Sequence, residues 1–153
     1  MMVMTRAIAL LALVAVVAPA CGHKNPPIAP ELVLPDSPGD LAAVATPEGV
    51  RLSWTRPTRY SGGGRMNDLD GFIIQRATGT GAVSAAFAQV GKVTLTDQNR
   101  FRKERRIEWL DTTATPGERY FYRVFALTLD GYRSVPAGPV SLAFGSPGAG
   151  SSP

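Results

Sequence analysis

Apolar and polar residues alternate along several short stretches between residues 41 and 144, and turn-forming residues separate these stretches. In the stretch GVRLSWTRP, Val50, Leu52 and Trp54 fall on one face of an extended chain, and polar residues fall on the other. Because proline has no N–H to donate within a sheet, Pro57 should end this strand. The pattern predicts a β-strand with one buried face.

Further strands are predicted at residues 70–77, 86–90, 106–111, 119–129 and 138–144. We expect turns at Asp70-Gly71 and Asp130-Gly131, between these runs. No stretch has the apolar stripe of an amphipathic helix, although TDQNRFRKERR has room for a turn or two. Short strands at this spacing are typical of an all-β sandwich.

Four segments carry a more specific resemblance: LSWTRP, LDGFIIQRA, DTTATPGERYFYRVFAL and DGYRSVPAGPVSL. In this order they resemble a fibronectin type III domain over residues 41–144, an immunoglobulin-like sandwich of about seven antiparallel strands. The resemblance implies that Tyr120 forms the tyrosine corner and that Tyr122, Val124 and Ala126 point into the core. The sequence departs from the family in the long loop YSGGGRMND and in the long connection over residues 91–106.

The N-terminus carries one positive charge and then twelve apolar residues, from 7 to 18. This run is shorter than the roughly 20 residues that span a bilayer, and it fits the apolar part of a secretory signal. Cys21, the one cysteine of the chain, follows Ala18, Pro19 and Ala20. The stretch resembles a bacterial lipoprotein signal, although Ala18 and Pro19 depart from the usual residues.

That resemblance implies cleavage before Cys21, acylation (palmitate) of the cysteine and, because Gly22 follows, sorting to the outer membrane. The start CGHKNPPIAP resembles that of many small Gram-negative lipoproteins. The alternative is ordinary cleavage after Ala20, which leaves a free thiol. A lone thiol is reactive in an oxidising compartment, which favours lipidation, and two or three acyl chains anchor firmly.

We therefore expect four parts: a lipoprotein signal peptide over residues 1–20, a lipidated tether over 21–40, the sandwich over 41–144 and a disordered tail over 145–153. The tether contains Pro26, Pro27, Pro30, Pro35 and Pro38. Prolines fix φ and lack a donor, so this segment should be an extended polyproline II spacer. The alternative is that the segment is itself a docking motif.

Catalysis needs converging nucleophiles, bases or metal ligands. The single Cys and the single His of the chain, Cys21 and His23, both lie on the tether. The sandwich therefore cannot assemble a Ser-His-Asp, Cys-His or His-based zinc site. Catalysis by carboxylates alone stays open in principle, but no pattern in the sequence pairs the acidic residues, so we expect no enzyme activity, no metal and no cofactor. The segment NDLDG faintly resembles a calcium loop, but Phe72, Ile73 and Ile74 follow where oxygen ligands are needed, so a turn is favoured.

The net charge is +4, which is too weak and too dispersed to indicate a nucleic-acid-binding protein. One run is dense, however: RFRKERR carries five positive charges in seven residues. Its basic residues are Arg100, Arg102, Lys103, Arg105 and Arg106. Arginine favours bidentate phosphate contact, so this loop either binds an anionic surface or is a solvated, partly neutralised loop.

The last strand feature is an apolar outer face. If Tyr120, Tyr122 and Val124 point inward, their neighbours point outward. This candidate interaction face contains Ile73, Phe121, Arg123, Phe125 and Leu127. Such a face is covered by the protein's own chain or used for docking, so we expect it to seat a partner or the proline-rich tether.

These features predict a membrane-anchored, non-catalytic binding or assembly module of the bacterial cell envelope with a protein partner. One alternative is an accessory role in outer-membrane assembly carried by the N-terminal lipopeptide. Another, disfavoured by the missing histidine, is an envelope hydrolase. The sandwich fold cannot name the partner, because it hosts many unrelated functions.

Overall fold

The computed structural model describes residues 29–79, 86–100 and 102–145. The described chain is almost entirely β-structure. Its strands are β1 (Gly39–Thr46), β2 (Gly49–Thr55), β3 (Leu69–Thr78), β4 (Ala88–Thr94), β5 (Arg106–Asp111), β6 (Arg119–Thr128) and β7 (Ala137–Ala143). Two short helical turns complete it, η1 (Pro30–Val33) and α2 (Asp97–Arg100).

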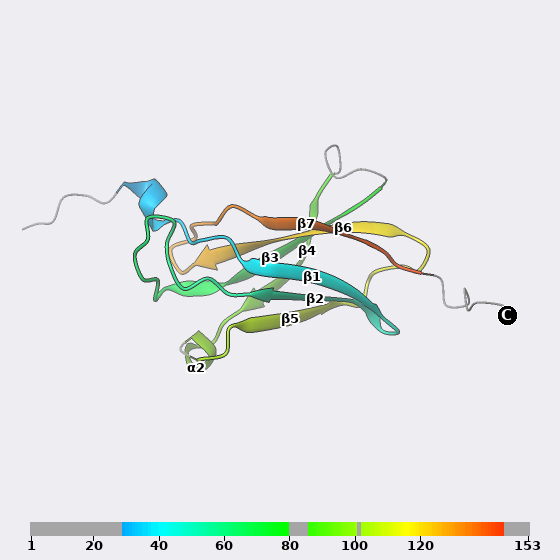
Figure 1. Ribbon diagram of the computed structural model, residues 1–153, viewed down its shortest axis with the longest axis horizontal. Coiled ribbons are helices and arrows are strands. Elements are labelled where there is room, and N and C mark those ends of the chain that lie inside the picture. The colour runs from blue at the N-terminus through cyan, green and yellow to red at the C-terminus, as the bar shows by residue number, and fades with distance from the viewer. Residues whose placement is uncertain (1–28, 80–85, 101, 146–153) are drawn as a thin grey trace, which may run out of the picture.

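The strands form two antiparallel sheets that face each other (Figure 1). One sheet has three strands in the order β1-β2-β5, and the other has four in the order β4-β3-β6-β7. The all-β sandwich predicted from the alternation of apolar and polar residues is therefore confirmed.

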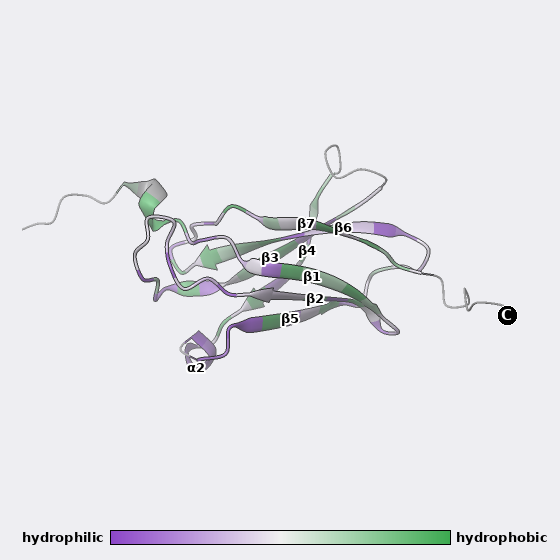
Figure 2. Ribbon diagram, viewed as in Figure 1, coloured by the Kyte–Doolittle hydropathy of each residue, from purple (hydrophilic) through white to green (hydrophobic). Residues whose placement is uncertain are grey.

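The core lies between the sheets. Val50, Leu52 and Trp54 of β2 are fully buried, as their alternation predicts. They face the four-stranded sheet, where the ring of Trp54 meets that of Phe72 edge-on, with 5.3 Å between ring centroids. Each such aromatic side chain contributes a large share of the apolar area removed from water. In Figure 2 the strands carry much of the hydrophobic colour, whereas α2 and the start of β5 are hydrophilic.

Strand β6 follows the predicted alternation on its inner face. Tyr120, Tyr122, Val124 and Ala126 all belong to the buried core cluster. The single turn of α2 also agrees with the expectation of a turn or two in this connection.

One strand was not predicted, one predicted strand is shifted, and one predicted turn is wrong. Strand β1 was not predicted, because GDLAAVAT does not alternate apolar and polar residues; in the structure none of its residues is buried. Strand β4 begins two residues late and runs on to Thr94, which shortens the connection that looked unusually long. Asp70 and Gly71 lie within β3 instead of forming a turn, and the carbonyl oxygen of Val93 occupies the space that a side chain at Gly71 would need.

The end of the predicted tether is docked on the sandwich. Instead of an extended spacer, residues 30–33 form the 3₁₀ turn η1. Beyond η1, the Ser61 N–H donates to the Leu34 carbonyl oxygen at 2.8 Å, and the Asp36 N–H donates to that of Arg59 at 3.0 Å. Pro35 is fully buried. The structured part of the chain therefore begins before residue 41.

The chain joins the sandwich at one end and leaves it at the other (Figure 1). We call the end that carries η1 and residues 56–68 the proximal end. The opposite end, where β1 turns into β2 and β6 begins, is the distal end. In the described part of the chain, no helix is long and apolar enough to cross a membrane.

Candidate functional site

A basic cleft of about 850 Å³ opens at the proximal end. One wall is the connection from β2 to β3, and the other is the connection from β4 to β5. Its basic lining residues are Arg56, Arg59, Arg65, Arg100, Arg102, Lys103 and Arg105. Among the described residues that line it, none is an aspartate or a glutamate.

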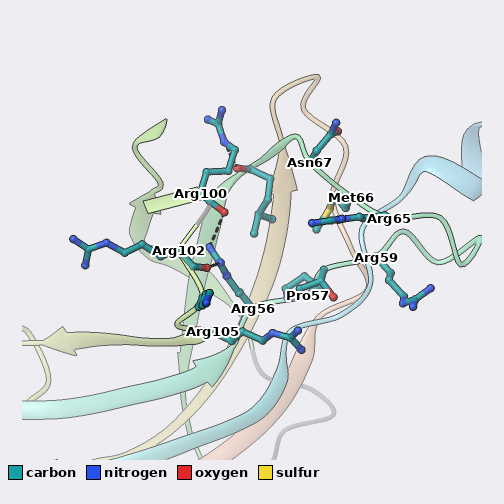
Figure 3. Close-up of a pocket in the computed structure, with 12 residues that line it drawn as sticks. Arg56, Pro57, Arg59, Arg65, Met66, Asn67, Arg100, Arg102 and Arg105 are labelled. Carbon is teal, nitrogen blue, oxygen red and sulfur yellow. Dashed lines mark hydrogen bonds between the residues drawn. The ribbon is translucent and has the colours of Figure 1, made fainter. Parts of the chain in front are cut away.

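Arg56 holds the two walls together from the base of the cleft (Figure 3). Its guanidinium donates to the carbonyl oxygens of Asn99 at 2.8 Å and Arg100 at 2.9 Å, and also to that of Arg102. Its side chain is buried, and burial, followed by repulsion from Arg105, lowers the pKa of Arg56 from its ordinary value. This arginine is a structural clamp on the second wall.

Arg100 is also engaged. Its Nε donates to the Leu69 carbonyl oxygen at 3.0 Å, and its Nη1 pairs with Asp97 at 2.9 Å. By contrast, the charged groups of Arg65, Arg102, Lys103 and Arg105 have no acceptor among the described residues. Figure 3 shows Arg65 and Arg102 on opposite sides of the cleft. These free cations are available to an external anion.

The sequence predicted the second wall and missed the first. Arg100, Arg102, Lys103 and Arg105 line the cleft, as a basic surface requires. Arg106 does not: it lies on β5 and donates to the Ser53 hydroxyl at 2.6 Å. The arginines at 56, 59 and 65 were not singled out, although their repetition in the glycine-rich loop RPTRYSGGGR was a usable signal.

The cleft is suited to a phosphate-bearing or carboxylate-bearing group. Guanidinium groups bind such anions through paired, charge-assisted hydrogen bonds. With no carboxylate in the described lining, an entering anion meets only attraction from the charged side chains. The arrangement supports binding, and it brings together no nucleophile and base.

The predicted outer face exists on the four-stranded sheet, but part of it is closed. Ile73 pairs with Phe125 across β3 and β6, and both Ile73 and Phe121 are buried. The Arg123 guanidinium lies 4.1 Å from the Phe87 ring centroid and 5.4 Å from that of Phe125. Phe125, Leu127 and Arg123 remain half-exposed.

The proline-rich segment does not supply the cover for this face in the described chain. The hydrogen bonds of residues 34–36 go to residues 59 and 61 at the proximal end instead. The expectation that the tether lies on the outer face therefore fails for the part of the tether that the structure describes.

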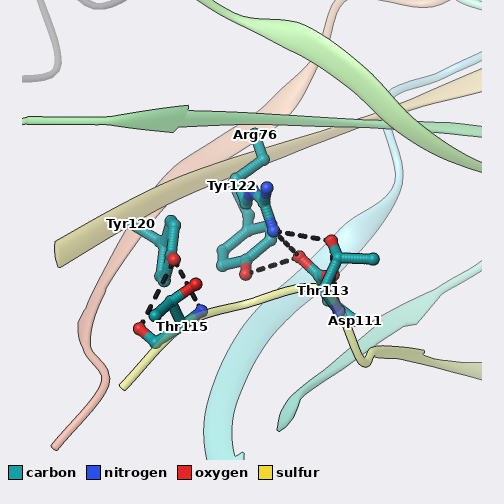
Figure 4. A network of polar contacts seen from close by, with 6 residues as sticks. All are labelled: Arg76, Asp111, Thr113, Thr115, Tyr120 and Tyr122. Atoms are coloured by element: carbon teal, nitrogen blue, oxygen red, sulfur yellow. Dashed lines mark hydrogen bonds and ion pairs between the residues drawn. The ribbon is translucent and has the colours of Figure 1, made fainter. Parts of the chain in front are cut away.

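Two groups of polar contacts in the sandwich, one at Tyr120 and one at Asp111, are structural (Figure 4). The Tyr120 hydroxyl accepts a hydrogen bond from the Thr115 N–H at 2.7 Å, which matches the tyrosine corner that the family resemblance implies. The buried Asp111 carboxylate binds Arg76 at 2.7 Å and accepts from the Tyr122 hydroxyl at 2.9 Å. Hydrogen bonds thus account for both tyrosine hydroxyls.

The carboxylates of NDLDG are engaged with neighbours. Asp68 accepts from the Tyr60 hydroxyl at 2.6 Å, and Asp70 lies 3.3 Å from the Lys92 ammonium. Burial, followed by the contact with Asp68, raises the pKa of Tyr60 to about 12. The described residues contain no group of three or more His, Cys, Asp or Glu arranged to hold a metal. Cys21 and His23 lie outside the described residues.

Comparison with known protein families finds no match, and comparison with curated proteins finds none either. Solved structures do match. The twitchin kinase region from C. elegans, a chain described as Fn31-NL-kin-CRD-Ig26, superposes with a TM-score of 0.51 at 18% identity, over 74% of this chain and 17% of that chain. The FN1–FN3 domains of chicken CNTN1 superpose with a TM-score of 0.47 at 16% identity, over 73% of this chain and 33% of theirs.

This chain thus spans 17% of the twitchin chain and 33% of the CNTN1 chain, and the likeness lies in the fold. The twitchin likeness and the two antiparallel sheets together show that the chain folds as a fibronectin type III-like sandwich.

Proposed function

We propose that this chain is a lipid-anchored, non-catalytic binding module of the bacterial cell envelope. In this proposal, acyl chains on Cys21 hold it in the outer membrane, and the sandwich engages an envelope protein. The observation that carries the proposal is the docking of residues 34–36 on the loop at 59–61. It fixes the sandwich to a segment that begins shortly after the lipidation residue.

The short stretch of sequence between Cys21 and the described chain supports a position at the membrane. Residues 22–28 separate Cys21 from the described chain, which begins at Ala29. A chain of this length spans at most about 30 Å, whatever its conformation. With two or three acyl chains on Cys21, the sandwich would therefore stay close to the bilayer surface.

The chemistry of the sandwich supports a binding role over catalysis. The single Cys and the single His of the sequence precede the sandwich, so no nucleophile there has a histidine base. The buried carboxylate of Asp111 and the half-buried carboxylate of Asp68 serve structural hydrogen bonds. Two surfaces predicted or found above are accessible to a partner: the half-exposed outer face at Phe125 and Leu127, and the basic cleft.

Labelling with radioactive palmitate in cells tests the anchor. We expect the label in the wild-type protein, its loss in Cys21→Ser, and a mature chain that starts at residue 21 by mass spectrometry. An unmodified thiol or a different mature N-terminus contradicts lipidation. The label in both proteins would place the acyl chain elsewhere.

Crosslinking in intact cells tests the binding role. We expect the full-length lipoprotein to crosslink to an envelope protein, and a chain truncated after Pro38 to lose that crosslink. If the truncated chain keeps both the crosslink and the cellular role, the N-terminal lipopeptide is the active part, and the module proposal is wrong.

A further inference from the structure

The proximal end combines two kinds of exposed side chain. The first is the set of free cations in the basic cleft, from Arg65 on one wall to Arg102 on the other. The second is a group of large apolar side chains left exposed to solvent. At this end these are Leu32, Leu129, Tyr132 and Val135.

The contrast with the distal end is clear for the exposed apolar residues. Val135, in the connection from β6 to β7, is 72% exposed. In the described chain, the one comparable residue near the distal end is Val44 of β1, at 58%. Isolated apolar residues on a surface are ordinary, whereas a group beside a cationic cleft indicates an interaction site.

Hydrogen bonds hold these elements in one unit. The Leu129 N–H donates to the Asp68 carbonyl oxygen at 2.8 Å, and the Asp68 carboxylate accepts from Tyr60 at 2.6 Å. The backbone of Gly62 also lies against Leu32 of η1: a Cβ atom added at Gly62 would be only 2.9 Å from the Leu32 carbonyl oxygen. The β6–β7 connection, the first wall of the cleft and η1 are therefore neighbours.

We propose that the proximal end is a membrane-contacting surface. The basic cleft receives the phosphates of anionic lipid headgroups, and the exposed apolar residues of η1 and the β6–β7 connection enter the interface among those headgroups. The inference rests on the proposed anchor, because the linker of at most about 30 Å keeps this end, and not the distal end, within reach of the bilayer.

The combination of side chains selects the partner. An anionic polysaccharide or a nucleic acid would satisfy the cations and leave Leu129, Tyr132 and Val135 in water. A zwitterionic bilayer would bury the apolar residues, but it has no net negative charge to attract the cations of the cleft. An anionic lipid surface satisfies both, since basic residues are attracted to it and apolar residues bury area in it.

The test uses a mature-length chain, residues 21–153 with Cys21→Ser, which contains both sheets and carries no acyl chain. We would measure its co-sedimentation with vesicles of phosphatidylcholine alone and with vesicles in which about a third of the lipid is phosphatidylglycerol. We expect binding to the anionic vesicles, no binding to the neutral ones, and release as the salt shortens the screening length from about 8 Å toward 3 Å.

Matched variants locate the contact. Arg65→Ser combined with Arg102→Ser is expected to weaken partitioning about 20- to 30-fold, because each cation near such a surface contributes about fivefold. The control is Arg51→Ser combined with Arg119→Ser, two exposed arginines on β2 and β6 near the distal end, with the same change in net charge. We expect the control to retain nearly all binding.

A second pair tests the apolar residues. Val135→Asp is expected to weaken partitioning about tenfold or more, and Val44→Asp to leave it within about twofold. Far-ultraviolet circular dichroism and thermal melts establish that each variant is folded. Equal losses in a variant and its control would show a diffuse charge effect and overturn the proposed surface.

Other outcomes also decide. Equal binding to both kinds of vesicle, or no binding to either, overturns the inference. So does binding to an anionic polysaccharide such as heparin with no binding to vesicles, since that result assigns the cleft to a polymer. The chain used for the vesicle experiment carries no acyl chain. A negative vesicle result therefore contradicts the membrane-contacting surface without contradicting lipidation of Cys21, and a negative palmitate result contradicts the anchor without contradicting vesicle binding.

Discussion

The indole ring of Trp109 lies directly against the backbone of Gly91. A methyl group at residue 91 would overlap the ring atoms Cζ2 and Cε2 of Trp109. Gly91 belongs to β4 and Trp109 to β5, which are edge strands of different sheets. This contact therefore closes one side of the sandwich, and glycine is required there because the ring fills the space of a side chain.

Gly91→Ala is expected to lower the free energy of unfolding by about 1–3 kcal/mol, because the added methyl group must displace the indole or separate the two strands. Urea unfolding followed by tryptophan fluorescence measures the loss. Gly64→Ala is the matched control, since a methyl group there would meet Tyr60 at an ordinary 3.6 Å. An unchanged unfolding midpoint for Gly91→Ala would contradict the contact.

Asp111→Asn should destabilise the protein by about 3 kcal/mol at pH 7, because it leaves Arg76 and the Tyr122 hydroxyl without their ionised acceptor. Asp97→Asn, which affects an exposed pair with Arg100, should change the stability by less than about 1 kcal/mol. Thermal or urea unfolding at neutral pH compares the two.

Asp111 also makes the free energy of unfolding depend on pH. Burial alone would raise the pKa of Asp111, but hydrogen bonds from Thr113, Tyr122 and Arg76 outweigh it and hold that pKa below its ordinary value. The ionised form is thus favoured by folding, and its contribution is complete above about pH 4 and lost as the pH falls through the lowered pKa. We expect the difference in the free energy of unfolding between the wild type and Asp111→Asn to become smaller as the pH is lowered. A constant difference down to pH 2, or about that value, would contradict this.

Arg56→Leu should release the second wall of the basic cleft, because three carbonyl oxygens between Asn99 and Arg102 lose their donor. We expect amide hydrogen exchange to accelerate over residues 97–105 and the free energy of unfolding to fall by about 2 kcal/mol. Arg51→Leu, at an exposed position on β2, the strand that precedes Arg56, is the control. Unaltered exchange in this loop would show that Arg56 does not hold it.

Phe125→Ser tests the outer face. It removes the cross-strand partner of Ile73 and one of the rings near Arg123, so a loss of about 1–2 kcal/mol is expected. If this face binds the envelope partner, crosslinking in cells is lost as well, whereas Val44→Ser on the other sheet keeps it. Stability and crosslinking both at wild-type levels would remove any role for the face.

The fold followed from local pattern because alternation on β2 and β6 has one interpretation: Val50, Leu52 and Trp54, or Tyr122, Val124 and Ala126, share a face only in a strand. Strand β1 lacked that pattern. Its alanines gain their place from pairing with β2, which is a tertiary effect that propensity does not contain. Asp70-Gly71 was misread for a similar reason, since the glycine is required by a neighbouring strand and not by a turn.

The cleft was half predictable. A run of charge such as RFRKERR is visible in one segment, whereas Arg59 and Arg65 become part of the same site because the ends of β2, β3 and β5 meet at the proximal end. Arg56 resembled its neighbours in the sequence, and it became a buried clamp through carbonyl oxygens more than forty residues away. Distant backbone acceptors leave no trace in a local pattern.

The opposite placement of the first and last described residues has a mechanical consequence. Ala29 precedes η1 at the proximal end and Gly145 follows β7 at the distal end, so the strands, which rise about 3.3 Å per residue, separate these two residues by roughly the length of a sheet. A force applied between these two residues would act along the strands, so it would load many of the hydrogen bonds between strands at the same time.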